Sequence, residues 1–221
     1  MVATTIVSSQ LLSRMAEASG ADYRETLTGF KWIANAAMEW TQRSGGEFLL
    51  GYEEALGYSI GTLVRDKDGV SAAALFAELI ADARARGDSI ADRLQAIYRR
   101  YGLYLTEQAS LALPGGDGLL RIAALMTRMR AAPPTHIGDC AVKSYADLAH
   151  GAGGLPKSDV LVYRLAGDRR IIMRPSGTEP KLKSYYEVRV PLGDDEPISA
   201  ATDRARRELA QLRDAHQSLL V

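Results

Sequence analysis

Two different spacings of apolar residues divide this sequence and limit the folds that it can adopt. Through the first hundred residues, short apolar runs rich in β-branched side chains, near residues 3–7, 23–27 and 48–52, alternate with segments of helical periodicity. This alternation predicts an α/β layer domain with a mixed sheet. Beyond it, short strands joined by tight turns lead to a final amphipathic helix at residues 198–216, which predicts a small α+β domain.

We therefore expect two domains, residues 1–104 and residues 105–221. In the first, residues 71–86 have helical periodicity, with Leu75, Leu79, Ile80 and Ala83 on one face. Ser89 followed by Asp92 is a capping-box pattern that predicts the start of the next helix. In the second, Gly167 and Asp168 lie between two apolar strands and predict a tight hairpin.

Composition narrows the function classes. Lys and Arg total 27, as do Asp and Glu, so no overall charge favours nucleic acid or an anionic membrane. Cys140 is the single cysteine, which excludes an internal disulfide framework and suits a reducing cytoplasm. No apolar run reaches the roughly 18 residues that span a bilayer, and no signal peptide is visible. The histidines, including His216, are scattered, and we interpret them as surface or loop residues.

The strongest chemical pattern is Arg-Pro-Ser-Gly-Thr-Glu-Pro at residues 174–180, between two apolar strands. A turn of Ser, Gly and Thr can present backbone N–H groups and hydroxyls to an anion, and Arg174 adds a planar fork that suits phosphate. Lys181 and Lys183 add positive charge on one side of an extended strand. A plain hairpin turn explains the spacing equally well, but the concentration of positive charge in a neutral chain favours a phosphate site.

Two further patterns lie in the first domain. Glu53 and Glu54 follow an apolar strand, and carboxylates there can accept hydrogen bonds from a sugar or act as acid and base. Lys31 follows Gly29 in an otherwise uncharged stretch. Taken alone, the carboxylates also fit a solvated loop and Lys31 fits a lysine at a helix start, and the residues by themselves favour those interpretations.

In this order along the chain, the patterns resemble the α-D-phosphohexomutases, the phosphoglucomutase and phosphomannomutase superfamily. The resemblance covers four segments, residues 27–33, 51–57, 65–69 and 174–180, and places the chain as the third and fourth of the family's four domains. It implies that the second domain resembles the TATA-binding-protein fold.

The resemblance implies a cytoplasmic enzyme that interconverts hexose 1-phosphate and hexose 6-phosphate through a phosphoserine and a bisphosphorylated sugar. Glu53, Glu54 and Lys31 would bind the sugar. The phosphate that does not react would be held by Arg174, Ser176, Gly177, Thr178, Lys183 and Lys181. This is the positioning and electrostatic work that phosphoryl transfer requires. Mg²⁺ would serve the full-length parent, and a glucose 1,6-bisphosphate type of activator is expected.

Two departures from the family pattern matter. Ala55 stands two residues after the first glutamate of the sugar loop, where the family usually has serine, so one hydroxyl contact is lost. The family's phosphoserine loop and its Asp-rich magnesium loop are also missing from these residues, which leaves no catalytic residue and no metal site here. We infer a piece of a longer enzyme that is inactive without its first two domains. The alternative is a non-catalytic sugar-phosphate-binding or regulatory module, and a purely structural interaction domain would require all four segments to be coincidental.

Overall fold

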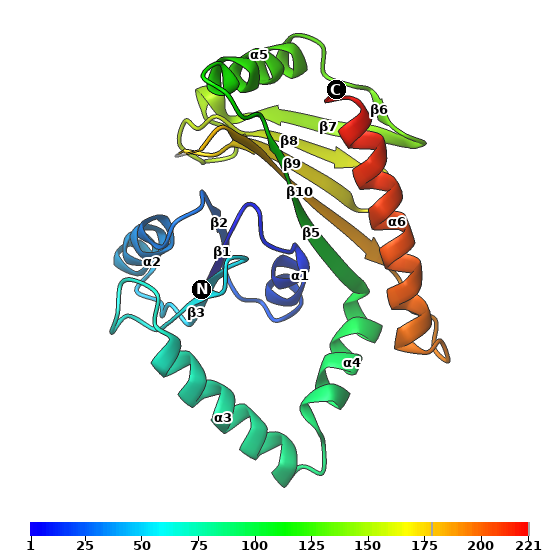
Figure 1. Ribbon diagram of the computed structural model, residues 1–221. Coiled ribbons are helices and arrows are strands. Elements are labelled where there is room, and N and C mark those ends of the chain that lie inside the picture. The colour runs from blue at the N-terminus through cyan, green and yellow to red at the C-terminus, as the bar shows by residue number, and fades with distance from the viewer. Residues whose placement is uncertain (178, 221) are drawn as a thin grey trace. The chain divides into compact units, whose positions relative to one another are not determined.

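The computed structural model describes residues 1–177 and 179–220, and the chain divides into two compact units. The first unit is Met1–Gly102 and the second begins at Leu103. Figure 1 shows the helices and strands of each unit. Each unit has a sheet of its own, in agreement with the α/β and α+β organisation that the apolar spacing predicts.

The first unit is a mixed-sheet α/β layer. Its elements are β1 (Val2–Thr5), α1 (Leu11–Ala18), β2 (Tyr23–Thr26), α2 (Phe30–Ser44), β3 (Leu50–Glu53), β4 (Gly57–Ile60), α3 (Gly69–Ala85) and α4 (Ile90–Tyr101). The strand order is β2-β1-β3-β4, with β1 parallel to β2 and β3 and with β4 antiparallel to β3. Strand β4 was not expected from the sequence, which indicated a loop after β3. Its four residues begin with Gly57 and are followed by Gly61, and such a short segment has little periodicity to detect.

Helix α2 packs onto this sheet through one apolar face. Phe30, Ile33 and Ala37 recur at helical spacing, and all three are buried against Ala3 and Phe48. Gly51 of β3 lies beneath this helix, because a Cβ there would come within 2.6 Å of the Ile33 side chain. The packing fixes the start of α2 beside the ends of β1 and β3, where the candidate sugar loop begins.

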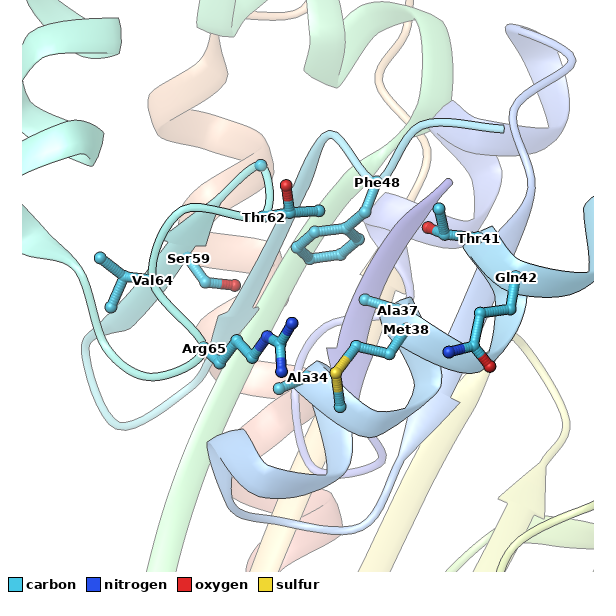
Figure 2. Close-up of a pocket in the computed structure, with 11 residues that line it drawn as sticks. Ala34, Ala37, Met38, Thr41, Gln42, Phe48, Ser59, Thr62, Val64 and Arg65 are labelled. Carbon is cyan, nitrogen blue, oxygen red and sulfur yellow. The ribbon is translucent and has the colours of Figure 1, made fainter. Parts of the chain in front are cut away.

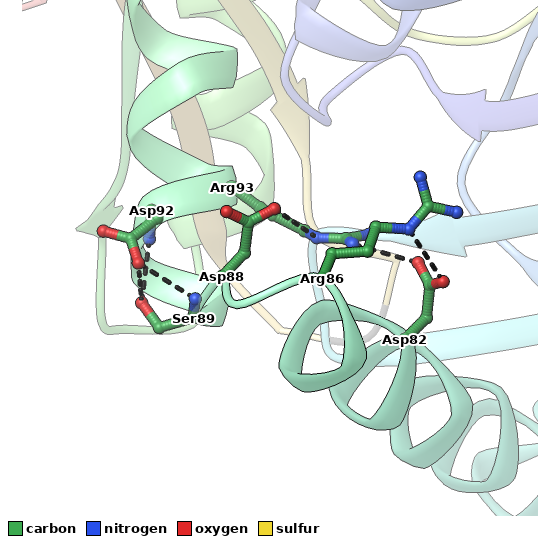
Figure 3. Close-up of polar contacts among 6 residues, drawn as sticks. All are labelled: Asp82, Arg86, Asp88, Ser89, Asp92 and Arg93. Atoms are coloured by element: carbon green, nitrogen blue, oxygen red, sulfur yellow. Dashed lines mark hydrogen bonds and ion pairs between the residues drawn. The ribbon is translucent and has the colours of Figure 1, made fainter.

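The connection between α3 and α4 has the predicted capping box (Figure 3). The Ser89 N–H donates to the Asp92 carboxylate at 2.9 Å, and the Asp92 N–H donates to the Ser89 hydroxyl at 3.1 Å. Arg93 of α4 then reaches back to Asp82 of α3 at 2.9 Å. These contacts determine where α3 ends and α4 begins.

Helix α3 is present as predicted, but most of its apolar face is exposed to solvent. Ala83 is buried, but Leu75 and Leu79 are exposed, and Phe76 is 51% exposed. Helical periodicity predicts which residues form an apolar stripe. It does not predict whether other residues of the chain pack against that stripe.

The second unit is built on one antiparallel sheet. Its elements are β5 (Leu103–Ala112), α5 (Gly118–Ala131), β6 (His136–Ile137), β7 (Cys140–Asp147), the 3₁₀ turn η1 (Leu148–His150), β8 (Leu161–Leu165), β9 (Arg169–Pro175), β10 (Lys181–Val190) and α6 (Ile198–Ser218). The strand order is β5-β10-β9-β8-β7-β6. The tight hairpin at Gly167 and Asp168 is present, with Leu165 paired to Arg169. Helix α6 runs along the sheet (Figure 1) and buries Ala201, Ala205, Leu209 and Leu212.

His216 is a core residue, which corrects its interpretation as a surface or loop histidine. Its side chain is fully buried at the end of α6, where Nδ1 lies 2.9 Å from the Tyr186 hydroxyl and Nε2 lies 3.2 Å from the Met173 sulfur. Burial lowers the pKa of His216 to about 4. The helical spacing from Leu209 and Leu212 to residue 216 would have placed this histidine on the buried face.

Candidate functional site

The candidate sugar loop lies at the carboxyl ends of parallel strands. Glu53 is the last residue of β3, and the loop from Glu54 to Leu56 joins it to β4. The segments that follow the neighbouring parallel strands begin at Ile6, after β1, and at Leu27, after β2. Sheets of this kind bind ligands at this edge, because the loops after adjacent parallel strands meet there.

Glu53 is held firmly within this loop. One carboxylate oxygen accepts a hydrogen bond from the Gly29 N–H, and the other lies 3.6 Å from the Lys67 ammonium group. The Glu53 side chain is only 10% exposed. Gly29 has a φ of 119°, a conformation that favours glycine, and it immediately precedes α2. The negative carboxylate therefore lies at the positive end of the α2 dipole, where charge and helix stabilise each other.

Glu54 and Lys31 are more accessible than Glu53. The Glu54 side chain is exposed, and its backbone N–H donates to the Ser8 hydroxyl at 3.1 Å, which ties the sugar loop to the segment after β1. Lys31 is exposed on the first turn of α2, with its ammonium group 5.3 Å from the centre of the Trp32 ring. Both residues can therefore offer charge to a ligand at this edge.

Lys67 is a charged residue of this site that the sequence reasoning did not single out. Besides pairing with Glu53, its ammonium group lies 5.7 Å from the centre of the Phe30 ring. The chain must come close to place it there, since a Cβ at Gly57 would lie 2.8 Å from the Lys67 side chain. Its position in the charged segment at residues 65–69 was the available signal.

The candidate phosphate loop joins β9 to β10. In the register of this hairpin Arg174 lies directly opposite Lys183, so the two positive side chains share one face of the sheet. Tyr185, two residues beyond Lys183, supports the arginine: Arg174 Nε donates to its hydroxyl at 3.4 Å, and the guanidinium lies 6.0 Å from the ring centre. The structure thus brings Arg174 and Lys183 together.

The residues of the turn that were predicted to bind phosphate differ in whether other groups of the chain already engage them. The Ser176 N–H donates to the Lys181 carbonyl at 2.8 Å, so that amide closes the hairpin instead of facing a ligand. The Lys181 ammonium group pairs with Glu179 at 3.1 Å, which offsets its charge. Gly177 is exposed, and Thr178 lies outside the described residues. The roles of these residues in binding phosphate stay predictions. Arg174 and Lys183 are the two that are placed best to bind an anion.

Within residues 1–177 and 179–220, no group of three or more His, Cys, Asp or Glu side chains could hold a metal ion. Magnesium, which the family resemblance implies for a complete enzyme, therefore has no fitting ligand set among these residues. In the same described segments, no helix combines the length and apolar character needed to cross a bilayer.

Two family descriptions match the chain in the order of its two units. "Phosphoglucomutase/phosphomannomutase, alpha/beta/alpha domain III" matches residues 1–101. "Phosphoglucomutase/phosphomannomutase, C-terminal domain" matches residues 142–194, which include the phosphate hairpin. The chain therefore belongs to the α-D-phosphohexomutase superfamily, whose carboxyl-terminal half it matches, and the resemblance seen in the four sequence segments is confirmed.

Similar curated proteins carry several mutase names. A probable phosphomannomutase of Haemophilus influenzae is 38% identical over 189 residues, which is 85% of this chain and 36% of that protein. A probable phosphoribomutase of Schizosaccharomyces pombe is 37% identical, over 85% of this chain and 34% of its own length. The human phosphopentomutase is 32% identical, over 95% of this chain and 35% of its own length. The chain thus spans about a third of the length of these relatives.

Solved structures support the same fold. The open form of a Paramecium phosphoglucomutase, pp63/parafusin, superposes with a TM-score of 0.67 at 18% identity, covering 98% of this chain and 38% of that one. A phosphoglucomutase/phosphomannomutase family protein of Burkholderia thailandensis gives a TM-score of 0.58 at 16% identity, covering 99% of this chain and 36% of that one.

Proposed function

We propose that this chain supplies the sugar-binding and distal-phosphate-binding domains of a phosphohexomutase. The parent enzyme interconverts hexose 1-phosphate and hexose 6-phosphate through a phosphoserine and a bisphosphorylated sugar. The family membership and the mutase names of the relatives support the reaction class. Hexose phosphates are then the ligands of this chain.

The observation that carries the proposal is the pair Arg174 and Lys183. Like charges directly opposite each other on neighbouring strands destabilise a sheet. Lys183 has no ion pair with any other described residue, and the strand register places it opposite Ser110 on one side and Arg174 on the other. An anion between the two side chains removes the repulsion, and a phosphate dianion matches two positive charges. The hairpin thus has the charge arrangement of a phosphate site.

The first unit acts on the sugar. Glu54 accepts hydrogen bonds from ring hydroxyls, and Glu53, whose oxygens already bind Gly29 and Lys67, holds the loop in place and accepts a further hydrogen bond with its remaining lone pairs. Lys31 adds positive charge at the same edge. These contacts bind and orient the substrate, and binding energy from the non-reacting part of a sugar phosphate can be used at the reacting end.

The chemical step belongs to groups outside these residues. Magnesium would supply charge stabilisation to phosphoryl transfer in the parent enzyme. The residues described here would not hold that ion, so their part is to bind the sugar and the phosphate that does not react. The parent's first two domains are the partners that would complete the enzyme.

The test is a calorimetric titration of this chain with glucose 1,6-bisphosphate at low salt, where screening is weak. We expect saturable binding that Arg174→Ala weakens about tenfold or more, because a charge-assisted contact is lost. Lys143→Gln is the matched control, since Lys143 is an exposed residue on β7 of the same sheet. Equal affinity in Arg174→Ala and Lys143→Gln would refute the phosphate site. A parallel titration with ribose 1,5-bisphosphate tests the preference for a hexose.

A mutase assay of the chain alone separates a piece of an enzyme from an enzyme. We expect no conversion of glucose 1-phosphate above that of a mock preparation, with or without magnesium. Turnover that copurifies with the chain and disappears in Arg174→Ala would contradict this assignment. Activity restored by adding the parent's first two domains would distinguish a mutase half from a purely regulatory sugar-phosphate-binding module.

A further inference from the structure

The first unit contains a cavity, apart from the sugar loop, between helix α2 and strand β4 (Figure 2). Its volume is about 380 Å³, within the range of small-molecule sites. Most of the wall is apolar and is formed by Ala34, Ala37, Met38, Phe48 and Val64. All of its lining residues belong to one unit, so the cavity does not depend on the second.

Two hydroxyl groups in this cavity have no hydrogen-bond partner among the described residues. Ser59 on β4 is 4% exposed, and its hydroxyl oxygen is buried without a partner. The hydroxyl oxygen of Thr41 on α2 is buried in the same way. A buried polar group without a hydrogen bond costs free energy comparable to a lost hydrogen bond. Two such groups lining one cavity from facing elements indicate a polar ligand that binds both.

Arg65 adds a positive charge to the same cavity. In Figure 2 its side chain extends between β4 and α2, with the guanidinium on the same side as Ala34 and Met38. The acids next to it are engaged elsewhere, because Asp66 accepts from the Lys67 N–H and Asp68 caps α3 through Ser71. Arg65 itself forms no ion pair with a described residue, so its five N–H donors are available to a ligand.

We propose that this cavity binds a small monocarboxylate with an apolar body. The guanidinium forms a two-pronged contact with a carboxylate, while Ser59 and Thr41 supply further hydrogen bonds. A monocarboxylate fits better than a phosphate ester, because the lining contains one cation and a dianion among apolar walls would be only half neutralised. The walls formed by Met38 and Phe48 accept an aromatic ring or a short alkyl chain.

The proposal does not rest on the mutase assignment, because no lining residue is assigned to the sugar or the phosphate, although Arg65 belongs to the segment at residues 65–69 that shares in the family resemblance. It does connect to the sugar loop through shared elements. Strand β4 forms one wall and continues the hairpin that carries Glu53, and helix α2 forms the other wall and follows directly after Gly29. An occupant of this cavity therefore contacts both elements that position the sugar loop.

The test is an amide NMR titration of the ¹⁵N-labelled chain with phenylacetate, with its neutral isostere phenylacetamide and with inorganic phosphate. We expect saturable shifts with phenylacetate at Thr41, Ser59 and Gly61, and much weaker binding of the amide and of phosphate. Arg65→Gln should raise the dissociation constant about tenfold or more. Ala34→Leu, which fills the cavity without changing charge, should also weaken binding.

Arg43→Gln is the matched control, because Arg43 lies on α2 outside the cavity and is 67% exposed. Its dissociation constant should equal that of the unchanged chain. The proposal is overturned if phenylacetate causes no saturable shift at the cavity, or if Arg65→Gln and Arg43→Gln bind it equally well. It is also overturned if phenylacetamide binds as tightly as phenylacetate, since the site would then recognise only an apolar body. The spectrum of each variant shows directly whether it is folded.

Discussion

Glu53 shows how one residue can serve stability and binding together. Its carboxylate satisfies the Gly29 N–H before α2 and pairs with Lys67 while being largely buried. Replacing it with Ala leaves a backbone donor and an ammonium group without their acceptor. We expect Glu53→Ala to lower the free energy of unfolding by about 1–3 kcal/mol in urea denaturation. Glu39→Ala, which removes an exposed pair with Arg43 on α2, should cost less than about 0.5 kcal/mol. Equal losses would show that the Glu53 contacts add nothing.

His216 predicts how stability depends on pH. Its folded pKa of about 4 lies below the ordinary value of 6.5, because burial disfavours the charged form. Between these values the unfolded chain binds a proton that the folded chain does not. The contribution is therefore complete above pH 6.5 and is lost as the pH falls toward 4, by an amount of the order of 3 kcal/mol.

The measurement is the free energy of unfolding by urea at a series of pH values between 4 and 8. His216→Gln removes this titration, so its stability should fall less steeply with decreasing pH, even if it is less stable throughout. His136→Gln is the control for the loss of a histidine side chain, because His136 is exposed on β6. Parallel pH profiles for the unchanged chain and His216→Gln would show that this histidine is not the source.

At the scale of elements, the hairpin of β3 and β4 must approach α2 closely. A Cβ at Gly57 would lie 2.6 Å from the Phe30 ring and 2.8 Å from the Lys67 side chain, and Lys67 pairs with Glu53. We expect Gly57→Ala to destabilise the chain by about 1–3 kcal/mol, because overpacking forces the neighbours to shift. Thermal unfolding followed by circular dichroism would measure the loss.

Gly69→Ala provides the comparison for that change. Gly69 opens helix α3, and a Cβ there would meet no atom within 4 Å. Alanine also favours helix over glycine, so this variant should be neutral or slightly stabilising. A loss in Gly69→Ala as large as that in Gly57→Ala would mean that backbone freedom, and not close approach, decides the effect at both positions.

An element could be predicted from the sequence to the extent that its own residues indicate what packs against it. Helices α2 and α6 have complete apolar faces that match a buried surface of the same unit, so periodicity predicted both. Strand β4 was missed because it owes its existence to pairing with β3, which no local pattern records. The stripe of α3 was recognised, but its burial was not predictable, since burial depends on what lies opposite.

The candidate site was predictable in part for the same reason. Arg174 and Lys183 share one apolar hairpin, and once its register is set they must lie opposite each other. The hydrogen bond from the Ser176 amide to the Lys181 carbonyl and the ion pair of Lys181 with Glu179 depend on the geometry of the turn. Composition does not predict either contact. Lys67 was overlooked because its partner Glu53 is distant in sequence.

At the scale of the whole molecule, the division at Gly102 predicts two independently folding parts. The second unit has its own buried core and holds both strands that flank β10, so the phosphate hairpin is complete within it. We expect a polypeptide of residues 103–221 to unfold cooperatively and to bind inorganic phosphate as tightly as the full chain does, with the same loss in Arg174→Ala. Calorimetric titration and thermal unfolding measure both properties. Failure of the shorter polypeptide to fold, or loss of phosphate binding in a folded one, would show that the first unit supports the hairpin and that the two parts are one cooperative structure.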